Sequence, residues 1–280
     1  MNIIDLKSLR TEQGNGATEI LDTLRTVELN VTEVCNRTCS FCPRGNPKLY
    51  PNSKDHMSLD IVELISKQLH SFNYNNRISI VGFGEPLLYK NLVQAVKIIH
   101  DNLPNLKWLE INTNGDFLTK ELLVELIDAG CNQLTVSMYD SDITPIINEL
   151  SKDLNIDISL KHCYNTKFEL KLVDRSNILI KGKALNINAP CNIPFYKMLI
   201  DWNGDVILCA NDWDRRGKID NITSSSIKDI WLSDKLMSYR IKLLDGNRKE
   251  LDPCKFCDVV GTVIGNDSVD VFKEHICLLS

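Results

Sequence analysis

Short β-branched stretches alternate with amphipathic stretches of helical spacing from Thr26 to about Asp174 of this chain. Thr26–Thr32 and Arg77–Val81 have the composition of strands, and the apolar residues that follow Ser58 fall on one helical face. Strands that alternate with helices of this length form β-α-β units around a parallel sheet. About six such units fit, fewer than the eight of a closed barrel. The pattern therefore predicts an α/β fold whose functional loops lie at the carboxyl ends of the strands.

The alternation stops after about residue 177. A hairpin is predicted around Asn203-Gly204, because both residues tolerate a positive φ angle. Helices are predicted over Ile227–Leu232 and Lys235–Leu244. We therefore expect an amino-terminal extension at residues 1–25, an alternating domain at 26–180 and a second domain at 181–280.

Charge and hydropathy exclude several classes of protein. The chain has 32 Lys and Arg residues against 37 Asp and Glu residues, and a net charge of −5 argues against a dedicated nucleic-acid binder. No apolar run approaches the roughly 18 residues that a membrane span needs, and Met1–Gly16 has no apolar signal core. These features predict a cytoplasmic protein, in which clustered cysteines hold metal more often than they form disulfides.

Three of the ten cysteines, Cys35, Cys39 and Cys42, lie close together directly after the first predicted strand. Three thiolates on one loop can ligate three corners of an iron–sulfur cube and leave one iron free to bind a chelating small molecule. A zinc site is the alternative, but structural zinc takes four ligands, and the nearest candidate is the distant His56. The spacing favours an iron–sulfur cluster.

Four further cysteines flank the predicted hairpin or form a late C-x-x-C pair: Cys191, Cys209, Cys254 and Cys257. Four thiolates hold either zinc or a fully ligated iron–sulfur cluster, and the spacing alone does not separate these possibilities. The isolated thiols Cys131, Cys163 and Cys277 are interpreted as structural residues.

Residues 35–42, Cys-Asn-Arg-Thr-Cys-Ser-Phe-Cys, resemble the signature of radical S-adenosylmethionine (SAM) enzymes. Residues 84–86, Gly-Glu-Pro, resemble the turn with which that family meets the methionyl ammonium, although Phe83 stands where the family has a first glycine. The resemblance implies a partial (β/α)6 barrel that binds SAM and a 4Fe–4S cluster on the three clustered cysteines. It also implies these SAM contacts: Phe41, Gly84, Glu85, Pro86, Asn112, Asn114 and Ser137.

The second half resembles the auxiliary-cluster extension called a twitch domain, the short form of the SPASM domain. The similarity includes the hairpin, the helix start Asp229-Ile230-Trp231 and the C-x-x-C pair. It implies a second 4Fe–4S cluster on the four flanking cysteines, with Cys277 as a candidate further ligand. Within the family the chain resembles alcohol dehydrogenases, since Arg175 falls near their substrate-facing arginine, but Asn211 stands in place of a substrate-binding glutamate.

The resemblance implies a function. A 5′-deoxyadenosyl radical would abstract hydrogen from a small polyhydroxylated substrate such as a sugar, cyclitol or nucleotide sugar. We expect two-electron oxidation of an alcohol, with Arg175 at the reacting hydroxyl and the auxiliary cluster as the electron acceptor. The implied protein partner is a one-electron reductase such as flavodoxin or ferredoxin, and we expect no nucleic-acid or membrane partner.

Other functions stay open. A redox-neutral epimerase would use one of the isolated thiols, Cys131, Cys163 or Cys277, to return a hydrogen to the substrate. A peptide-modifying maturase is a second possibility, because auxiliary-cluster domains also occur in such enzymes. A zinc-bound scaffold would explain the C-x-x-C pair but not the ordered motifs at the strand ends.

Overall fold

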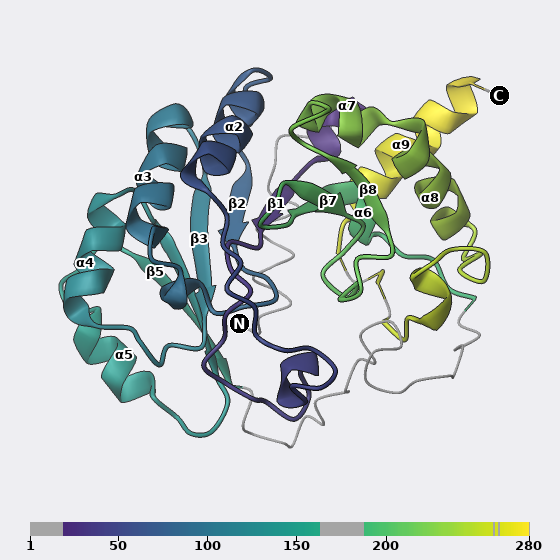
Figure 1. Ribbon diagram of the computed structural model, residues 1–280. Coiled ribbons are helices and arrows are strands. Elements are labelled where there is room, and N and C mark those ends of the chain that lie inside the picture. Colours follow the sequence, from purple (N-terminus) through teal and green to yellow (C-terminus); the bar gives the residue numbers. More distant parts are fainter. Residues whose placement is uncertain (1–18, 163–187, 260, 263, 280) are drawn as a thin grey trace.

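The computed structural model describes residues 19–162, 188–259, 261–262 and 264–279. Its strands form one eight-stranded sheet in the order β5-β4-β3-β2-β1-β6-β7-β8 (Figure 1). Strands β1 to β6 pair in parallel, and β7 and β8 are antiparallel to their neighbours. The strands are β1 Thr26–Leu29, β2 Arg77–Ile80, β3 Trp108–Thr113, β4 Gln133–Met138, β5 Asp157–His162, β6 Lys197–Ile200, β7 Asp205–Ile207 and β8 Lys218–Asn221.

The helices fall into two groups. Figure 1 shows α2, α3, α4 and α5 in a row along one face of the parallel strands, while α7, α8 and α9 gather at the other end of the sheet. The α-helices are α2 Leu59–His70, α3 Leu92–Asn102, α4 Lys120–Asp128, α5 Thr144–Leu150, α6 Ile193–Tyr196, α7 Ile227–Leu232, α8 Asp234–Leu244 and α9 Asn266–Leu279. Short 3₁₀ turns are η1 Ile20–Thr23, η2 Pro43–Gly45, η3 Pro86–Leu88 and η4 Cys254–Phe256.

Local sequence signals set the helix ends. The Ser58 side chain caps α2 by accepting a hydrogen bond from the Ile61 amide, and Thr119 caps α4 in the same way. Gly130 follows α4 with a φ of 109°, the left-handed conformation that glycine adopts without steric cost. These predicted helix boundaries are confirmed.

The predicted hairpin is confirmed too, and it has an additional partner. Gly204, with a φ of 86°, turns β6 into β7. Strand β6 also pairs in parallel with the whole of β1, from Thr26 opposite Lys197 to Leu29 opposite Ile200. The sheet therefore continues from the alternating half into the carboxyl-terminal part without a break, and it brings loops of both parts to the same edge.

The carboxyl-terminal helices are fixed to the start of the described chain. The buried Trp231 of α7 donates a hydrogen bond of 3.0 Å from its indole to the carbonyl of Ile20 in η1. The buried Arg240 guanidinium stacks over the Trp231 ring and over Phe272 of α9. Within the described residues, no helix is both long and apolar enough to cross a membrane.

Candidate active site

A cavity of about 240 Å³, called the open cavity below, lies where the carboxyl ends of the parallel strands meet. Loops after β1 and β2, the ends of β3, β4 and β5, and Trp213 of the β7–β8 connection all line it. The structure brings these residues expected from the sequence into its wall: Cys35, Cys39, Phe41, Cys42, Gly84, Glu85, Asn112, Asn114 and Ser137. Pro86 is not among the lining residues, since it is buried at the start of η3.

The clustered cysteines occupy a tightly folded loop. The Cys42 amide donates a 3.0 Å hydrogen bond to the Cys39 carbonyl, and the Asn52 side chain bonds both the amide and the carbonyl of Cys35. A Cβ atom at Gly45 would stand only 2.5 Å from the Cys39 carbonyl oxygen, so this close approach needs glycine. The three thiols are half-buried and face one cavity.

The pKa values of these thiols bear on whether the loop can bind a metal cluster. Burial, followed by the neighbouring Cys42 thiolate, raises the pKa of Cys39 to about 11. Burial also raises the pKa of Cys35. Thiols that repel one another as anions are stabilised as thiolates by a bound cation, so the donor set fits a metal cluster. No three His, Cys, Asp or Glu side chains in the described part of the chain are grouped closely enough to hold a single metal ion.

The turn after β2 packs directly against the loop that leads to the cysteines. The Glu85 amide donates a 2.8 Å hydrogen bond to the Val34 carbonyl. A Cβ atom at Gly84 would collide with the Thr32 carbonyl and stand 2.7 Å from that of Val34. Phe83, which replaces a family glycine, turns its ring toward Trp213 at a centroid distance of 4.7 Å. The departure from the family motif therefore connects the turn to the β7–β8 connection.

Glu85 organises the ends of β2 and β3. Its buried carboxylate accepts hydrogen bonds from the Thr113 hydroxyl at 2.5 Å, from the Asn114 amide at 2.9 Å and from the Leu87 amide at 3.0 Å. Burial outweighs these bonds and raises the pKa of Glu85. A carboxylate has about four lone-pair sites, so one acceptor site is left for a ligand.

Asn114 and Arg37 tie the cysteine loop to the ends of β3 and β4. The Asn114 side-chain amide donates to the Asn36 side chain at 2.9 Å. The Arg37 guanidinium binds Asp116 in a bidentate manner and also contacts Asp140 at 2.6 Å. The hydrogen bonds that Arg37 donates to Asp116 hold the pKa of Arg37 above its usual range. These contacts fix the start of the loop to the segments that follow both strands.

A buried ionic network, which the sequence reasoning missed, lies beside the open cavity. Glu33 binds Arg44 at 2.7 Å and Arg215 at 2.5 Å, and Arg215 also binds Asp201 at 2.8 Å. Arg44 donates in addition to the Phe83 carbonyl. The network therefore connects the cysteine loop, the turn after β2, the β6–β7 hairpin and the β7–β8 connection. No sequence signal pairs residues as far apart as Glu33 and Arg215.

The second set of cysteines lines a much smaller cavity of about 20 Å³, called the closed cavity below. Arg248 secures its wall by donating to the backbone carbonyls of Ala189, Pro190 and Val259. Burial, and then the nearby thiols, raise the pKa of Cys209 well above its usual value. The residues that line it are mostly apolar, and they include Cys191, Cys209, Cys254 and Cys257.

The residues that follow Cys209 have different surroundings. Asn211 lines the closed cavity rather than the open one. Asp212 is buried and accepts hydrogen bonds from the backbone amides of Arg216 and Gly217, and burial raises its pKa to about 6. Asp212 therefore shapes its own loop.

Three groups expected from the sequence lie outside the described residues: Arg175, Cys163 and the side chain of Cys277. His56 forms a β-bridge with Thr32 and does not line the open cavity, so the structure gives no support to a zinc ligand there. Cys131 is buried just before β4, at the end of the sheet opposite the open cavity. Burial raises the pKa of Cys131 to about 12.

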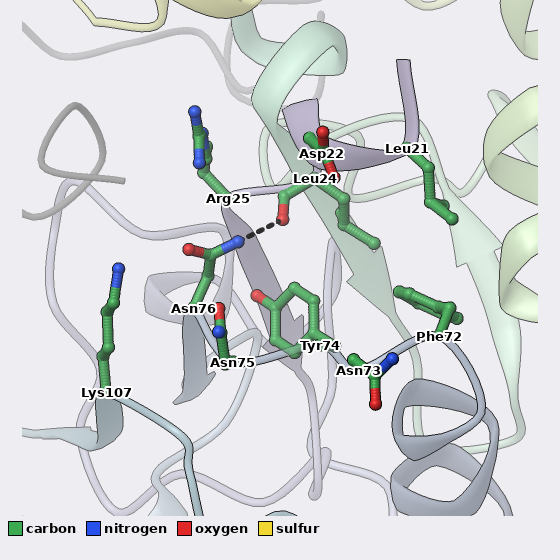
Figure 2. Close-up of a pocket in the computed structure, with 10 residues that line it drawn as sticks. All are labelled: Leu21, Asp22, Leu24, Arg25, Phe72, Asn73, Tyr74, Asn75, Asn76 and Lys107. Atoms are coloured by element: carbon green, nitrogen blue, oxygen red, sulfur yellow. Dashed lines mark hydrogen bonds between the residues drawn. The ribbon is translucent and has the colours of Figure 1, made fainter. Parts of the chain in front are cut away.

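A third cavity, of about 270 Å³, lies at the amino ends of the strands (Figure 2). Arg25 precedes β1, Asn76 precedes β2 and Lys107 precedes β3, and Asn76 donates a hydrogen bond to the Leu24 carbonyl. No cysteine lines this cavity among the described residues. The candidate chemistry therefore lies at the carboxyl ends, as expected for a parallel α/β sheet.

Comparison with known proteins agrees with this geometry. The model of the radical SAM superfamily matches residues 29–156, and that of the SPASM iron–sulfur cluster-binding domain matches residues 191–258. The S-adenosyl-L-methionine-dependent 2-deoxy-scyllo-inosamine dehydrogenase of Niallia circulans is 31% identical over 84% of this chain and 92% of its own length. A GTP 3′,8-cyclase of Sulfurovum sp. is 34% identical over 45% of this chain and 36% of its own length.

Solved structures extend the comparison. The crystal structure of BtrN in complex with AdoMet and 2-DOIA matches with a TM-score of 0.71 and 29% identity, over 87% of this chain and 97% of that one. Native anSMEcpe with bound AdoMet matches with a TM-score of 0.57 at 13% identity, over 91% of this chain and 97% of that one. The second match shows a shared fold alone.

Proposed function

This chain belongs to the radical SAM superfamily, and from that premise we propose that it oxidises an alcohol of a small polyhydroxylated substrate by two electrons. It is an enzyme that binds SAM and a 4Fe–4S cluster, and its SPASM domain binds additional iron–sulfur. The observation that carries the proposal is the contrast between an open cavity with three thiols and a closed one with four. We also propose that the boundary between the radical SAM domain and the SPASM domain lies near residue 180.

In the open cavity, Cys35, Cys39 and Cys42 would hold the cluster whose fourth iron faces the cavity. When bound there, SAM and the cluster supply the power to remove a hydrogen atom from an unactivated carbon. The chain's own residues orient the ligands: the remaining acceptor site of Glu85 suits the SAM ammonium. The other proposed SAM contacts are Phe41, Gly84, Asn112, Asn114 and Ser137, with Pro86 shaping the turn from behind.

Aromatic side chains form part of the wall of the open cavity. Phe41 packs on Tyr139 at a centroid distance of 5.2 Å, and Trp213 packs edge-on against both Tyr50 and Phe83. A reactive carbon centre requires such a wall, because stray hydrogen donors would quench it.

The closed cavity suits an electron acceptor. A cluster with four cysteine ligands has no position left for substrate, so it exchanges electrons only. In the proposed reaction the substrate carbon would lose one hydrogen atom and its hydroxyl a proton, and a cluster held by the four cysteines of the closed cavity would supply the acceptor for the remaining electron. Arg175 would face the hydroxyl and stabilise the oxyanion that forms. The electron that starts each turnover would come from a one-electron reductase such as flavodoxin or ferredoxin.

The redox-neutral alternative requires a thiol that reaches the substrate. Cys131 does not line the open cavity, and burial holds its pKa at about 12. A zinc scaffold does not account for the match to the radical SAM superfamily. The epimerase therefore depends on Cys163 or Cys277, and we place it second.

The experiment is turnover of a panel of polyols in heavy water under anaerobic conditions, with mass spectrometry of the product. Oxidation predicts a carbonyl compound about two mass units lighter than the substrate, without solvent deuterium at the reacting carbon. A product of unchanged oxidation state with one deuterium would establish the epimerase instead. A Cys131→Ala variant is the matched control, and its product should equal that of the parent enzyme.

A further inference from the structure

A small apolar cluster of side chains lies between the two sets of cysteines. Its buried members are Phe83, Leu199, Ile207 and Trp213. Cys42 of the first cysteine set packs against this cluster. Ala210, the residue after Cys209 of the second set, packs against it as well. The cluster therefore joins the loop of the first cysteine set to the connection that follows the second.

One member of this cluster carries a polar atom without a partner. The Trp213 side chain is 5% exposed, and its indole Nε1 is buried and makes no hydrogen bond with any residue that the structure describes. The other three members have only carbon in their side chains. Buried donors are nearly always satisfied in folded proteins, by protein, water or a bound group. The orphaned indole therefore indicates that its acceptor comes with a bound group.

The contacts of the Trp213 ring restrict which atom this acceptor can be. Tyr50 and Phe83 each pack edge-on against the ring at a centroid distance of 4.7 Å, and the Arg44 guanidinium lies 6.0 Å from its centroid. Phenylalanine has no acceptor, and arginine only donates. The Tyr50 hydroxyl is already bonded to a carboxylate. Cys42 packs on the same cluster, and its sulfur is the acceptor that metal binding would strengthen.

The position of Trp213 favours the first cysteine set over the second. Trp213 and Cys42 both line the open cavity, and Trp213 is not among the residues that line the closed cavity. A cysteine that ligates a metal is deprotonated, and an ionised acceptor forms hydrogen bonds about twice as strong as a neutral one. Binding of a cluster therefore turns the Cys42 thiol into the acceptor that the indole lacks.

We propose that Trp213 donates its indole hydrogen to the Cys42 thiolate when the 4Fe–4S cluster is bound, and that this bond raises the reduction potential of that cluster. Reduction makes a cluster more negative, and hydrogen bonds to its sulfurs stabilise the more negative form. The inference rests on the proposed assignment of the cluster to Cys35, Cys39 and Cys42, and it does not depend on alcohol oxidation. It gives a residue of the SPASM domain control over the electron that starts each turnover.

The test is pulsed electron paramagnetic resonance of the reduced, cluster-loaded enzyme, in which the indole nitrogens of all four tryptophans carry ¹⁵N. We expect a ¹⁵N coupling on the cluster signal that SAM shifts. Trp213→Phe keeps an aromatic ring but lacks the indole nitrogen, and it should lose the coupling. The half-buried Trp202 lines neither cysteine cavity, so Trp202→Phe is the matched control and should keep the coupling.

The reduction potential gives a second readout. A redox titration of Trp213→Phe should show the equilibrium constant for reduction of the open-cavity cluster lowered about tenfold, which is about 59 mV for one electron. The potential of the closed-cavity cluster and the iron content should equal those of the parent enzyme. The parent enzyme decides even where Trp213→Phe fails to hold the cluster, because absence of the ¹⁵N coupling in the parent overturns the inference.

Three further results would overturn it: a coupling that persists in Trp213→Phe, a coupling on the signal that SAM does not shift, or an unchanged potential in Trp213→Phe. Each of these leaves the proposed function standing if the parent enzyme forms the carbonyl product. Conversely, a product of unchanged oxidation state would contradict alcohol oxidation and leave the role of Trp213 standing. A SAM-responsive cluster that survives replacement of Cys35, Cys39 and Cys42 would contradict the proposed ligand assignment itself.

Discussion

The two cysteine-lined cavities differ in volume and in the polarity of their walls, and these properties decide what each cavity can bind. The open cavity holds about 240 Å³ and is walled by charged, amide and hydroxyl groups around three thiols. The closed cavity holds about 20 Å³ and has four thiols in a mostly apolar wall. Space and polar groups beside the first set suit a ligand that changes chemically, whereas the second set leaves room for a group that only exchanges electrons.

The two cavities nevertheless belong to one sheet. Strand β6 continues the parallel ladder of β1, and the connection that follows Cys209 returns Trp213 to the wall of the open cavity. Arg215 of the same connection binds Glu33, next to the first cysteine loop. The two cavities thus belong to one continuous sheet. A continuous sheet can hold two clusters at a fixed distance, which electron transfer between them requires.

The largest expected effect comes from removing either set of thiols. Replacement of Cys35, Cys39 and Cys42 by Ala should abolish SAM cleavage and leave about one cluster, because only the closed-cavity ligands remain. Replacement of Cys254 and Cys257 should preserve SAM cleavage and abolish carbonyl formation, because the second electron then has no acceptor. Iron analysis and quantification of 5′-deoxyadenosine check both variants. Full SAM cleavage by the triple variant would remove the distinction between the cavities.

A smaller effect, on stability, is expected from Glu33→Gln. This variant tests whether the buried ionic network couples the two cavities. The substitution leaves Arg44 buried without its carboxylate and weakens the hold on Arg215. Loss of one partner of a buried ion pair costs about 3–5 kcal/mol of unfolding free energy. Chemical denaturation should show this loss in one transition, with the signals of both clusters falling together. Independent loss of one cluster signal would show that the network does not couple the cavities.

The smallest expected effect is that of Glu85→Gln. Glutamine of the same shape turns an NH₂ group toward the Thr113 hydroxyl or the Asn114 amide, which are both donors in the present arrangement. A hydrogen bond to a charged group contributes about 1.5–3 kcal/mol, so SAM affinity should fall about 10–100-fold. Equilibrium binding measures this, with iron content as the control. Unchanged SAM affinity would show that the turn is structural only.

The helix caps and the hairpin turn could be predicted from the residues at those positions. Ser58, Thr119 and Gly204 specify their caps and turn through their own side chains or backbone freedom, so the sequence alone placed them correctly. The open-cavity residues were expected from their resemblance to the family's motifs, and they come together because parallel strands bring their carboxyl ends to one edge.

Long-range pairing was not predictable. Glu33 and Arg215 lie 182 residues apart and meet only because β6 adds to β1. Pro86 was placed among the SAM contacts by its motif, but in the structure it is buried at the start of η3 and does not line the open cavity.

The central claim is that only the open cavity holds a cluster with a ligand-accessible iron. Electron paramagnetic resonance of the reduced, reconstituted enzyme, with and without SAM, tests it most directly, using the Cys254→Ala/Cys257→Ala variant to assign the signals. The account predicts two cluster signals, of which SAM shifts only the one that survives in this variant. A shift of the signal that the variant lacks, or of neither signal, would contradict the account.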